Sequence, residues 1–83
     1  MKWFISLWIM IALQWDANSE VDLVGYKLYA RASTEPAFKC ISTLHKQTEV
    51  QVKVDGRRNW YFYVTARNKS QESSPSNIVY VPR

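Results

Sequence analysis

The chain has 83 residues, which is enough for one small domain with a thin core. Apolar residues make up 47% and charged residues 22%, a composition typical of a globular domain and not of a disordered chain. The net charge is +4, but the basic residues are scattered, so nucleic acid is not an expected partner. The single cysteine, Cys40, cannot form an internal disulfide and is expected to be a small buried residue.

The amino terminus begins with Lys2 and an apolar run from Trp3 to Leu13. A positive start before an apolar stretch is typical of a secretory signal, and the run is too short to cross a bilayer as a helix. Cleavage near residues 17–19 would remove Leu13 and Trp15, which we expect in a core strand. Three interpretations stay open: a signal, a short first strand, or a segment that docks elsewhere.

Three strands are predicted in the first half of the chain, and in the first two of them apolar side chains recur at every second position. Over residues 9–15 these are Ile9, Ile11, Leu13 and Trp15. Turn-forming residues occupy 16–20. Over residues 26–31, the side chains of Tyr26, Leu28 and Ala30 share one face, and those of Lys27, Tyr29 and Arg31 share the other. After a loop at 33–36, residues 38–41 form a short strand.

The second half of the chain predicts three more strands. Residues 49–54 alternate, with Val50, Val52 and Val54 on one face, and Asp55-Gly56 is a strong turn motif. In the aromatic strand 60–67, Trp60, Phe62, Val64 and Ala66 face one way, and Tyr61, Tyr63, Thr65 and Arg67 the other. A polar loop over 68–77 precedes a last strand at 78–81. Short strands separated by turns, without a helical period, predict a sandwich or barrel.

Several short motifs, in this order, resemble the fibronectin type III family, nearest to its bacterial and phage branch. The segments Leu13-x-Trp15-Asp16-Ala17-Asn18 and Asp22-Leu23-Val24-Gly25-Tyr26-x-Leu28-Tyr29 resemble strands B and C. The segments Trp60-Tyr61-Phe62-x-Val64-Thr65-Ala66-x-Asn68 and Glu72-Ser73-x-Pro75-Ser76-Asn77 resemble strands F and G. The resemblance implies an all-β, immunoglobulin-like β-sandwich of about 6–7 strands. It divides the chain into an apolar segment, residues 1–8, and a domain, residues 9–83, in which strand A is short or absent.

The resemblance also implies a core with Trp15 at its centre. The expected core residues are Leu13, Trp15, Tyr26, Leu28, Val52, Trp60, Phe62 and Val64. Trp60 stands where the family usually carries a corner tyrosine, and its indole can donate one hydrogen bond but cannot accept one.

Nothing in the sequence predicts catalysis. The only histidine, His45, has no second histidine to pair with, and no metal-ligand spacing surrounds it. The acidic loop from Asp16 to Asp22 could offer oxygens to calcium but lacks the frame of an EF-hand. Phosphate-binding glycine loops and nucleophile motifs are missing too. We therefore expect no enzyme activity, no cofactor and no metal site.

Two surfaces are candidates for binding. Without strand A, a sheet edge would stay unpaired, and such an edge invites another chain. The expected interface residues there are Trp3, Phe4, Trp8 and Met10, unless the amino terminus folds back over its own edge. The second candidate is an outer sheet face that carries Tyr29, Tyr61, Tyr63 and Tyr80. Tyrosines there can stack on sugars or anchor a protein partner, or they simply stabilise the sheet as cross-strand pairs.

The sequence thus predicts a non-enzymatic structural or interaction module, a small component of a larger assembly such as a virion or a cell-surface structure. Its partners would be proteins, including copies of itself, or a surface glycan, with no transmembrane span. Two alternatives stay open: a carbohydrate-binding module that uses the surface tyrosines, and a secreted adhesion or spacer domain with an amino-terminal signal.

Overall fold

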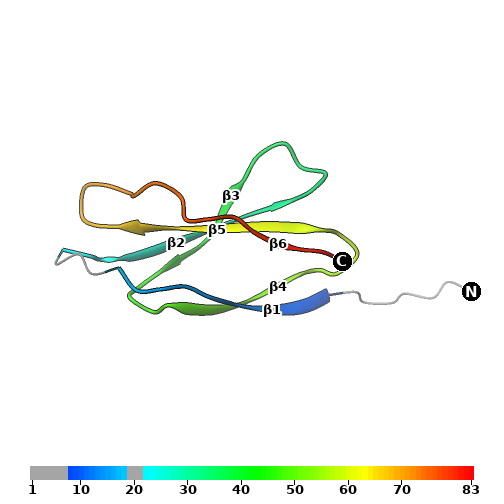
Figure 1. The fold of residues 1–83 in the computed structure, drawn as a ribbon, viewed down its shortest axis with the longest axis horizontal. Coiled ribbons are helices and arrows are strands. Elements are labelled where there is room, and N and C mark those ends of the chain that lie inside the picture. The colour runs from blue at the N-terminus through cyan, green and yellow to red at the C-terminus, as the bar shows by residue number, and fades with distance from the viewer. Residues whose placement is uncertain (1–7, 19–21) are drawn as a thin grey trace, which may run out of the picture.

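The computed structural model describes residues 8–18 and 22–83, and within them it contains six strands and no helix (Figure 1). The strands are β1 (Trp8–Gln14), β2 (Gly25–Ala32), β3 (Lys39–Leu44), β4 (Glu49–Asp55), β5 (Trp60–Arg67) and β6 (Val79–Val81). The expectation of an all-β chain is confirmed. Residues 1–7, which include Trp3 and Phe4, lie outside the described part.

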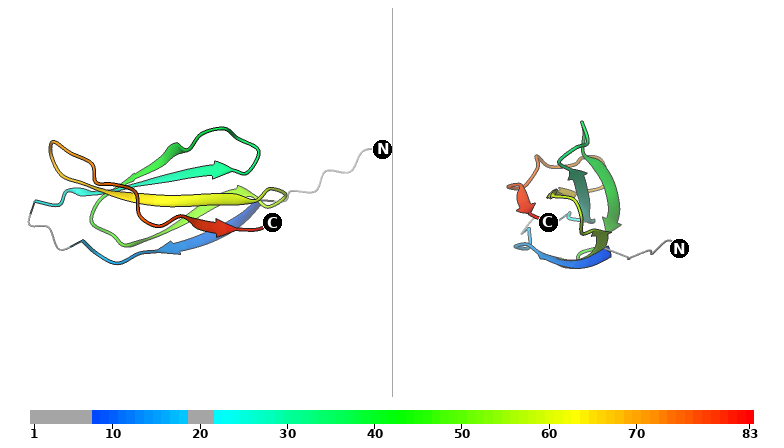
Figure 2. Two further views of the ribbon diagram at one scale, coloured as in Figure 1. Left: turned by 45° about the horizontal axis from the view of Figure 1, so that its top comes forward. Right: turned by 90° about the vertical axis from the view of Figure 1, so that its right-hand side faces the viewer.

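The strands form two antiparallel sheets that pack as two layers (Figure 2). One sheet pairs β1 with β4, and the other has the order β3-β2-β5-β6. Only β2–β3 and β5–β6 join neighbours within a sheet; every other connection crosses between the layers. The Asp55-Gly56 turn is one of these crossings, and neither glycine has a positive φ.

On β2 and β4 the alternation has the predicted sense, whereas on β5 Thr65, expected on the outward face, is buried. On β2 the side chains of Tyr26, Leu28 and Ala30 are buried, and on β4 those of Val52 and Val54 are buried. The other face of β4, which carries Glu49, Gln51 and Lys53, is exposed. Alternating apolar residues form strands here because each sheet buries one face and leaves the other toward solvent.

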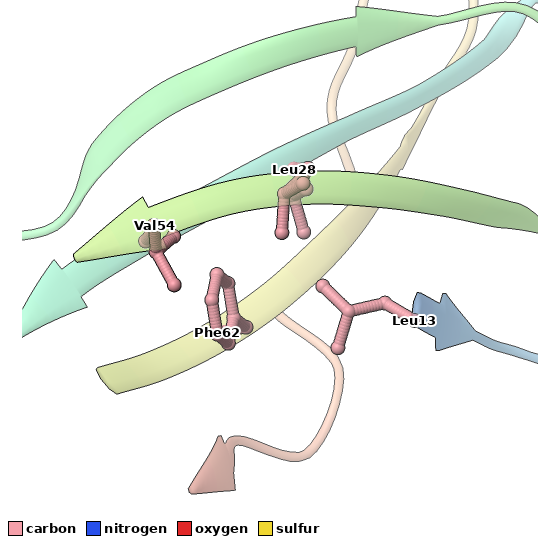
Figure 3. Close-up of a cluster of buried hydrophobic side chains, with 6 residues drawn as sticks. Leu13, Leu28, Val54 and Phe62 are labelled. Atoms are coloured by element: carbon pink, nitrogen blue, oxygen red, sulfur yellow. The ribbon is translucent and has the colours of Figure 1, made fainter. Parts of the chain in front are cut away.

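The main core lies between the sheets. Leu13 and Val54 of one sheet point toward Leu28 and Phe62 of the other (Figure 3). A second cluster at one end joins Leu23, Tyr26, Leu44 and Ala66. These contacts hold the two layers together through the hydrophobic effect.

Trp15 is less deeply buried than expected. Its side chain is only partly buried and packs against both core clusters, with its ring 5.4 Å from that of Tyr26. Tyr26, Phe62 and Leu28 are the largest fully buried side chains instead. Trp15 follows the last residue of β1, beside the opening between the layers, where no further strand covers it among the described residues.

Further expectations, for Trp60, Val64 and Cys40, can be compared with the structure. Trp60 and Val64 are partly buried and pack on the main core cluster, short of full burial. The Trp60 indole N–H donates to the backbone carbonyl of Asp55 at 2.9 Å. It thereby ties the start of β5 to the turn before it, as a corner tyrosine would. Cys40 is exposed, contrary to expectation.

Candidate functional site

The outer face of the four-stranded sheet brings together every predicted surface tyrosine. The register places Tyr29 of β2 opposite Tyr63 of β5, and Tyr61 of β5 opposite Tyr80 of β6. Strand alternation turns these side chains away from the core that their neighbours fill. We call the group Tyr29, Arg31, Phe38, Tyr61, Tyr63 and Tyr80 the aromatic face.

The rings of the aromatic face pack against one another. Those of Tyr29 and Tyr63 stack with centroids 4.7 Å apart and planes 16° from parallel. Phe38 meets Tyr63 edge-on, also at 4.7 Å, and Tyr61 lies 4.9 Å from Tyr80. Such offset and edge-on pairs are favourable geometries for aromatic rings, so these contacts stabilise the sheet by themselves.

Arg31 joins the two groups of rings. Its guanidinium carbon lies 4.7 Å from the ring centre of Tyr61 and 5.3 Å from that of Phe38. The same guanidinium donates to the backbone carbonyl of Glu35 at 3.0 Å. A cation over an aromatic face is attracted by the ring quadrupole. The row therefore runs without a break from Tyr80 to Tyr29.

The far end of the row is anchored by charge. The Tyr29 hydroxyl donates to a Glu72 carboxylate oxygen at 2.6 Å, and the Lys27 ammonium lies 3.3 Å from the other oxygen. The hydrogen bond to Glu72 raises the pKa of Tyr29 to about 12. The same hydrogen bond, helped by Lys27, lowers the pKa of Glu72. These contacts hold the loop between β5 and β6 against β2.

This packing limits what the aromatic face can offer a ligand. Tyr29, Tyr61 and Tyr63 are partly buried by their neighbours, whereas Tyr80 is 49% exposed. A sugar ring needs an open aromatic face to stack on, so Tyr80 is the most available platform. Sequence reasoning placed Arg31 on the same face as Tyr29 without naming it as a binding residue, and it missed Phe38. Alternation with Tyr29 was enough to find Arg31, but the β-bulge between β2 and β3 hides the position of Phe38.

A second surface carries five of the seven large hydrophobic side chains that are exposed among the described residues. Trp8 is 57% exposed, Met10 61% and Ile9 40% on β1; Ile78 is 55% and Val79 41% exposed at β6. We call β1 together with Ile78 and Val79 the open side, because Leu13 of β1 and Val79 line the same opening between the layers (Figure 2). Exposed apolar patches of this kind mark interaction sites more often than single exposed residues do.

The opening itself reaches the core. A hollow of about 270 Å³ lies between β1 and β6, and Leu13, Leu28, Phe62 and Val79 are among its lining residues. Trp15 lines it too, and the indole N–H of Trp15 is buried without a hydrogen-bond partner. An unmade hydrogen bond on a buried donor costs stability. The open side is thus the part of the sandwich where the core is least covered.

The described residues offer little catalytic or metal-binding geometry. Within 8–18 and 22–83 no group of three or more His, Cys, Asp or Glu side chains could hold a metal ion. Part of the acidic loop that could have offered oxygens, residues 19–21, lies outside the described part. His45 is exposed. Over the same ranges, no helix has the length and apolar character needed to cross a membrane.

No protein-family model matches this sequence, and no curated protein matches it either.

Proposed function

We propose that the chain is a non-enzymatic interaction module of the fibronectin type III kind, which binds protein partners through its open side as a component of a larger assembly. The observation that carries the proposal is the concentration of exposed apolar side chains there. Among the described residues, five of the seven large exposed hydrophobic side chains lie there, whereas Tyr80 belongs to the aromatic face and Ile41 to β3. Burying such a patch against a partner releases roughly 25 cal/mol per Å² of apolar surface.

The strand order supports the fibronectin type III part of this proposal. With β1 and β2 taken as strands B and C, and β5 and β6 as strands F and G, the strands C, F and G share one sheet and B lies in the other. That division is the one expected of this sandwich. The Trp60 contact with Asp55, which resembles a tyrosine corner, supports it as well.

Trp8 and Met10 test the proposal, because both point out of the sheet and their replacement leaves the core untouched. The control is Glu49→Ser with Gln51→Ser, on the facing strand and also exposed. Immobilised chain would be exposed to extracts of the virions or cells that carry it, and retained proteins identified by mass spectrometry. We expect Trp8→Ser with Met10→Ser to lose partners that the control retains. Equal retention by both variants would contradict the proposal.

A second candidate function is carbohydrate binding by the aromatic face, favoured by its row of aromatic rings, which Arg31 makes continuous. It predicts retention on an insoluble polysaccharide such as cellulose or chitin, and loss of retention in Tyr61→Ala, Tyr63→Ala and Tyr80→Ala. Binding that Trp8→Ser leaves unchanged would separate this function from the first. In either case we place the protein in a virion or at a cell surface.

A further inference from the structure

One edge of β1 has no strand beside it among the described residues, and the register shows which backbone groups it presents. The Trp15 N–H donates to the Thr48 carbonyl at 2.9 Å, in line with the β1–β4 register. Antiparallel pairs alternate between bonded and non-bonded positions. Residues 9, 11 and 13 therefore bond to β4, and the N–H and C=O groups of residues 8, 10, 12 and 14 point to the open edge.

The side chains of β1 do nothing to protect this edge. Its sequence, Trp-Ile-Met-Ile-Ala-Leu-Gln, contains no charge, no proline and no glycine. Natural edge strands are usually kept from pairing by lysine, proline or inward-pointing charges. The other edge strands have such features: β3 begins at Lys39, β4 carries Glu49 and Lys53, and Pro82 follows β6. The β1 edge therefore lacks the features that usually keep an edge strand from pairing with another strand.

We propose that a second copy of this chain occupies the edge, so that two β1 strands pair antiparallel about a two-fold axis at Ile11. The inference rests on the proposed function and names its partner. β1 spans residues 8–14, so Ile11 is its midpoint. In this register Trp8 faces Gln14 of the second copy and Met10 faces its Ala12. Every backbone group that points to the edge then meets a complementary group, and a continuous β4-β1-β1-β4 sheet results.

The side chains fit the same register. Small Ala12 leaves room for the long Met10 of the second copy, and no charged side chain of β1 is brought opposite another. On the inner face, Ile9 of the second copy comes opposite Leu13, along the hollow that the exposed Val79 also lines. Closed two-fold pairing of one patch with itself is the commonest form of protein self-association. Because each copy carries a charge of +4, added salt strengthens the pairing.

A proline at Ala12 tests the pairing directly. Ala12 lies opposite Gln51 of β4 at a non-bonded position, so the two N–H groups point to opposite edges of the two-stranded sheet. Ala12→Pro removes a donor from the proposed interface, and Gln51→Pro removes the matching donor from the far edge. Both variants strain the same sheet, which makes the second the control for the first.

The readout is the mass in solution over a range of concentrations. The full chain is expected to reach twice its 9.8 kDa in multi-angle light scattering. Gln51→Pro should dimerise at the same concentration as the unchanged chain. Ala12→Pro should stay monomeric even at a tenfold higher concentration than that. Ala12→Lys keeps the N–H and places a charge on the edge, so it repeats the test if the proline variant fails to fold.

Amide hydrogen exchange distinguishes a second copy at the β1 edge from other occupants of that edge. In the dimer the amides of Met10, Ala12 and Gln14 are slow to exchange, and they become fast on dilution. A monomer with these amides fast at every concentration would overturn the proposal. A monomer with slow amides would overturn it in favour of the chain's own amino terminus. A dimer indifferent to both Ala12 variants would place the contact elsewhere. The unchanged chain could be monomeric and still bind protein partners that the Trp8→Ser with Met10→Ser variant loses. In that case only the pairing with a second copy is refuted, and the proposed function stands.

Discussion

At Gly25, one added methyl group would disturb the four-stranded sheet. It opens β2 and is buried. A Cβ built on it would overlap the carbonyl oxygen of Leu44 and lie 2.9 Å from that of His45, whereas ordinary contacts of such a carbon lie at 3.4–4 Å. Both obstacles are backbone atoms, so no side-chain rotation relieves the overlap. In Gly25→Ala the start of β2 must separate from the end of β3.

The cost follows from this geometry. Overpacking a tight site typically costs about 1–3 kcal/mol, and a clash with rigid backbone belongs at the upper end of that range. Alanine also lowers the conformational entropy of the unfolded chain relative to glycine, which offsets up to about 1 kcal/mol of this cost. We expect a net loss of about 2–3 kcal/mol in the free energy of unfolding. For a domain of this size, that lowers the melting temperature by roughly 8–24 °C.

Thermal unfolding followed by circular dichroism measures this effect, and the chain contains its own control. Gly56, the only other glycine, lies in the turn after β4 with a negative φ, and an added Cβ there meets no such obstacle. Gly56→Ala should change stability by no more than about 0.5 kcal/mol, or raise it slightly. If both variants melt at the same temperature, the close approach of β2 and β3 is refuted.

Three further predictions concern the aromatic side chains. Trp15→Ala should cost about 2–4 kcal/mol in urea denaturation, below the usual cost for a fully buried tryptophan, and Trp15→Phe clearly less because the indole N–H has no partner. Trp60→Phe should lose the hydrogen bond to Asp55 and about 0.5–1.5 kcal/mol, and an unchanged stability would show that the bond contributes nothing. The pKa of Tyr29 is raised to about 12 by Glu72, so the stabilisation it provides is fully present below pH 10 and is lost as the pH rises toward 12. Tyr29→Phe should remove this part of the pH dependence of unfolding, and identical profiles for the two proteins would contradict the assignment.

The strands were largely predictable because their signal is local. A period of two along β2 and β4 depends only on which side chains follow one another, and the structure buries the predicted face of each. The tyrosines of the outer face were predictable for the same reason, since Tyr61 and Tyr63 alternate with the buried Phe62.

Contacts between distant segments could not be read in this way. Arg31 lies between Tyr61 and Phe38 only because β2 pairs with β5 in one register and the chain returns through a bulged β3. The turn motif at Gly56 was recognisable, but the sequence does not show that it crosses between sheets. Nor does it show that Gly25 is needed for space, because the obstructing atoms belong to the end of β3.

What the sequence by itself determined is therefore the class of the fold, most strands and the face that each one buries. The tertiary structure alone decided how deeply each side chain is buried and which edge stays open among the described residues. Trp15 shows the difference: its place at the end of a core-facing pattern was correct, but its burial depends on what covers the gap between β1 and β6. Alternation is a property of neighbours in the chain, whereas pairing and burial depend on segments that come together only when the sandwich closes.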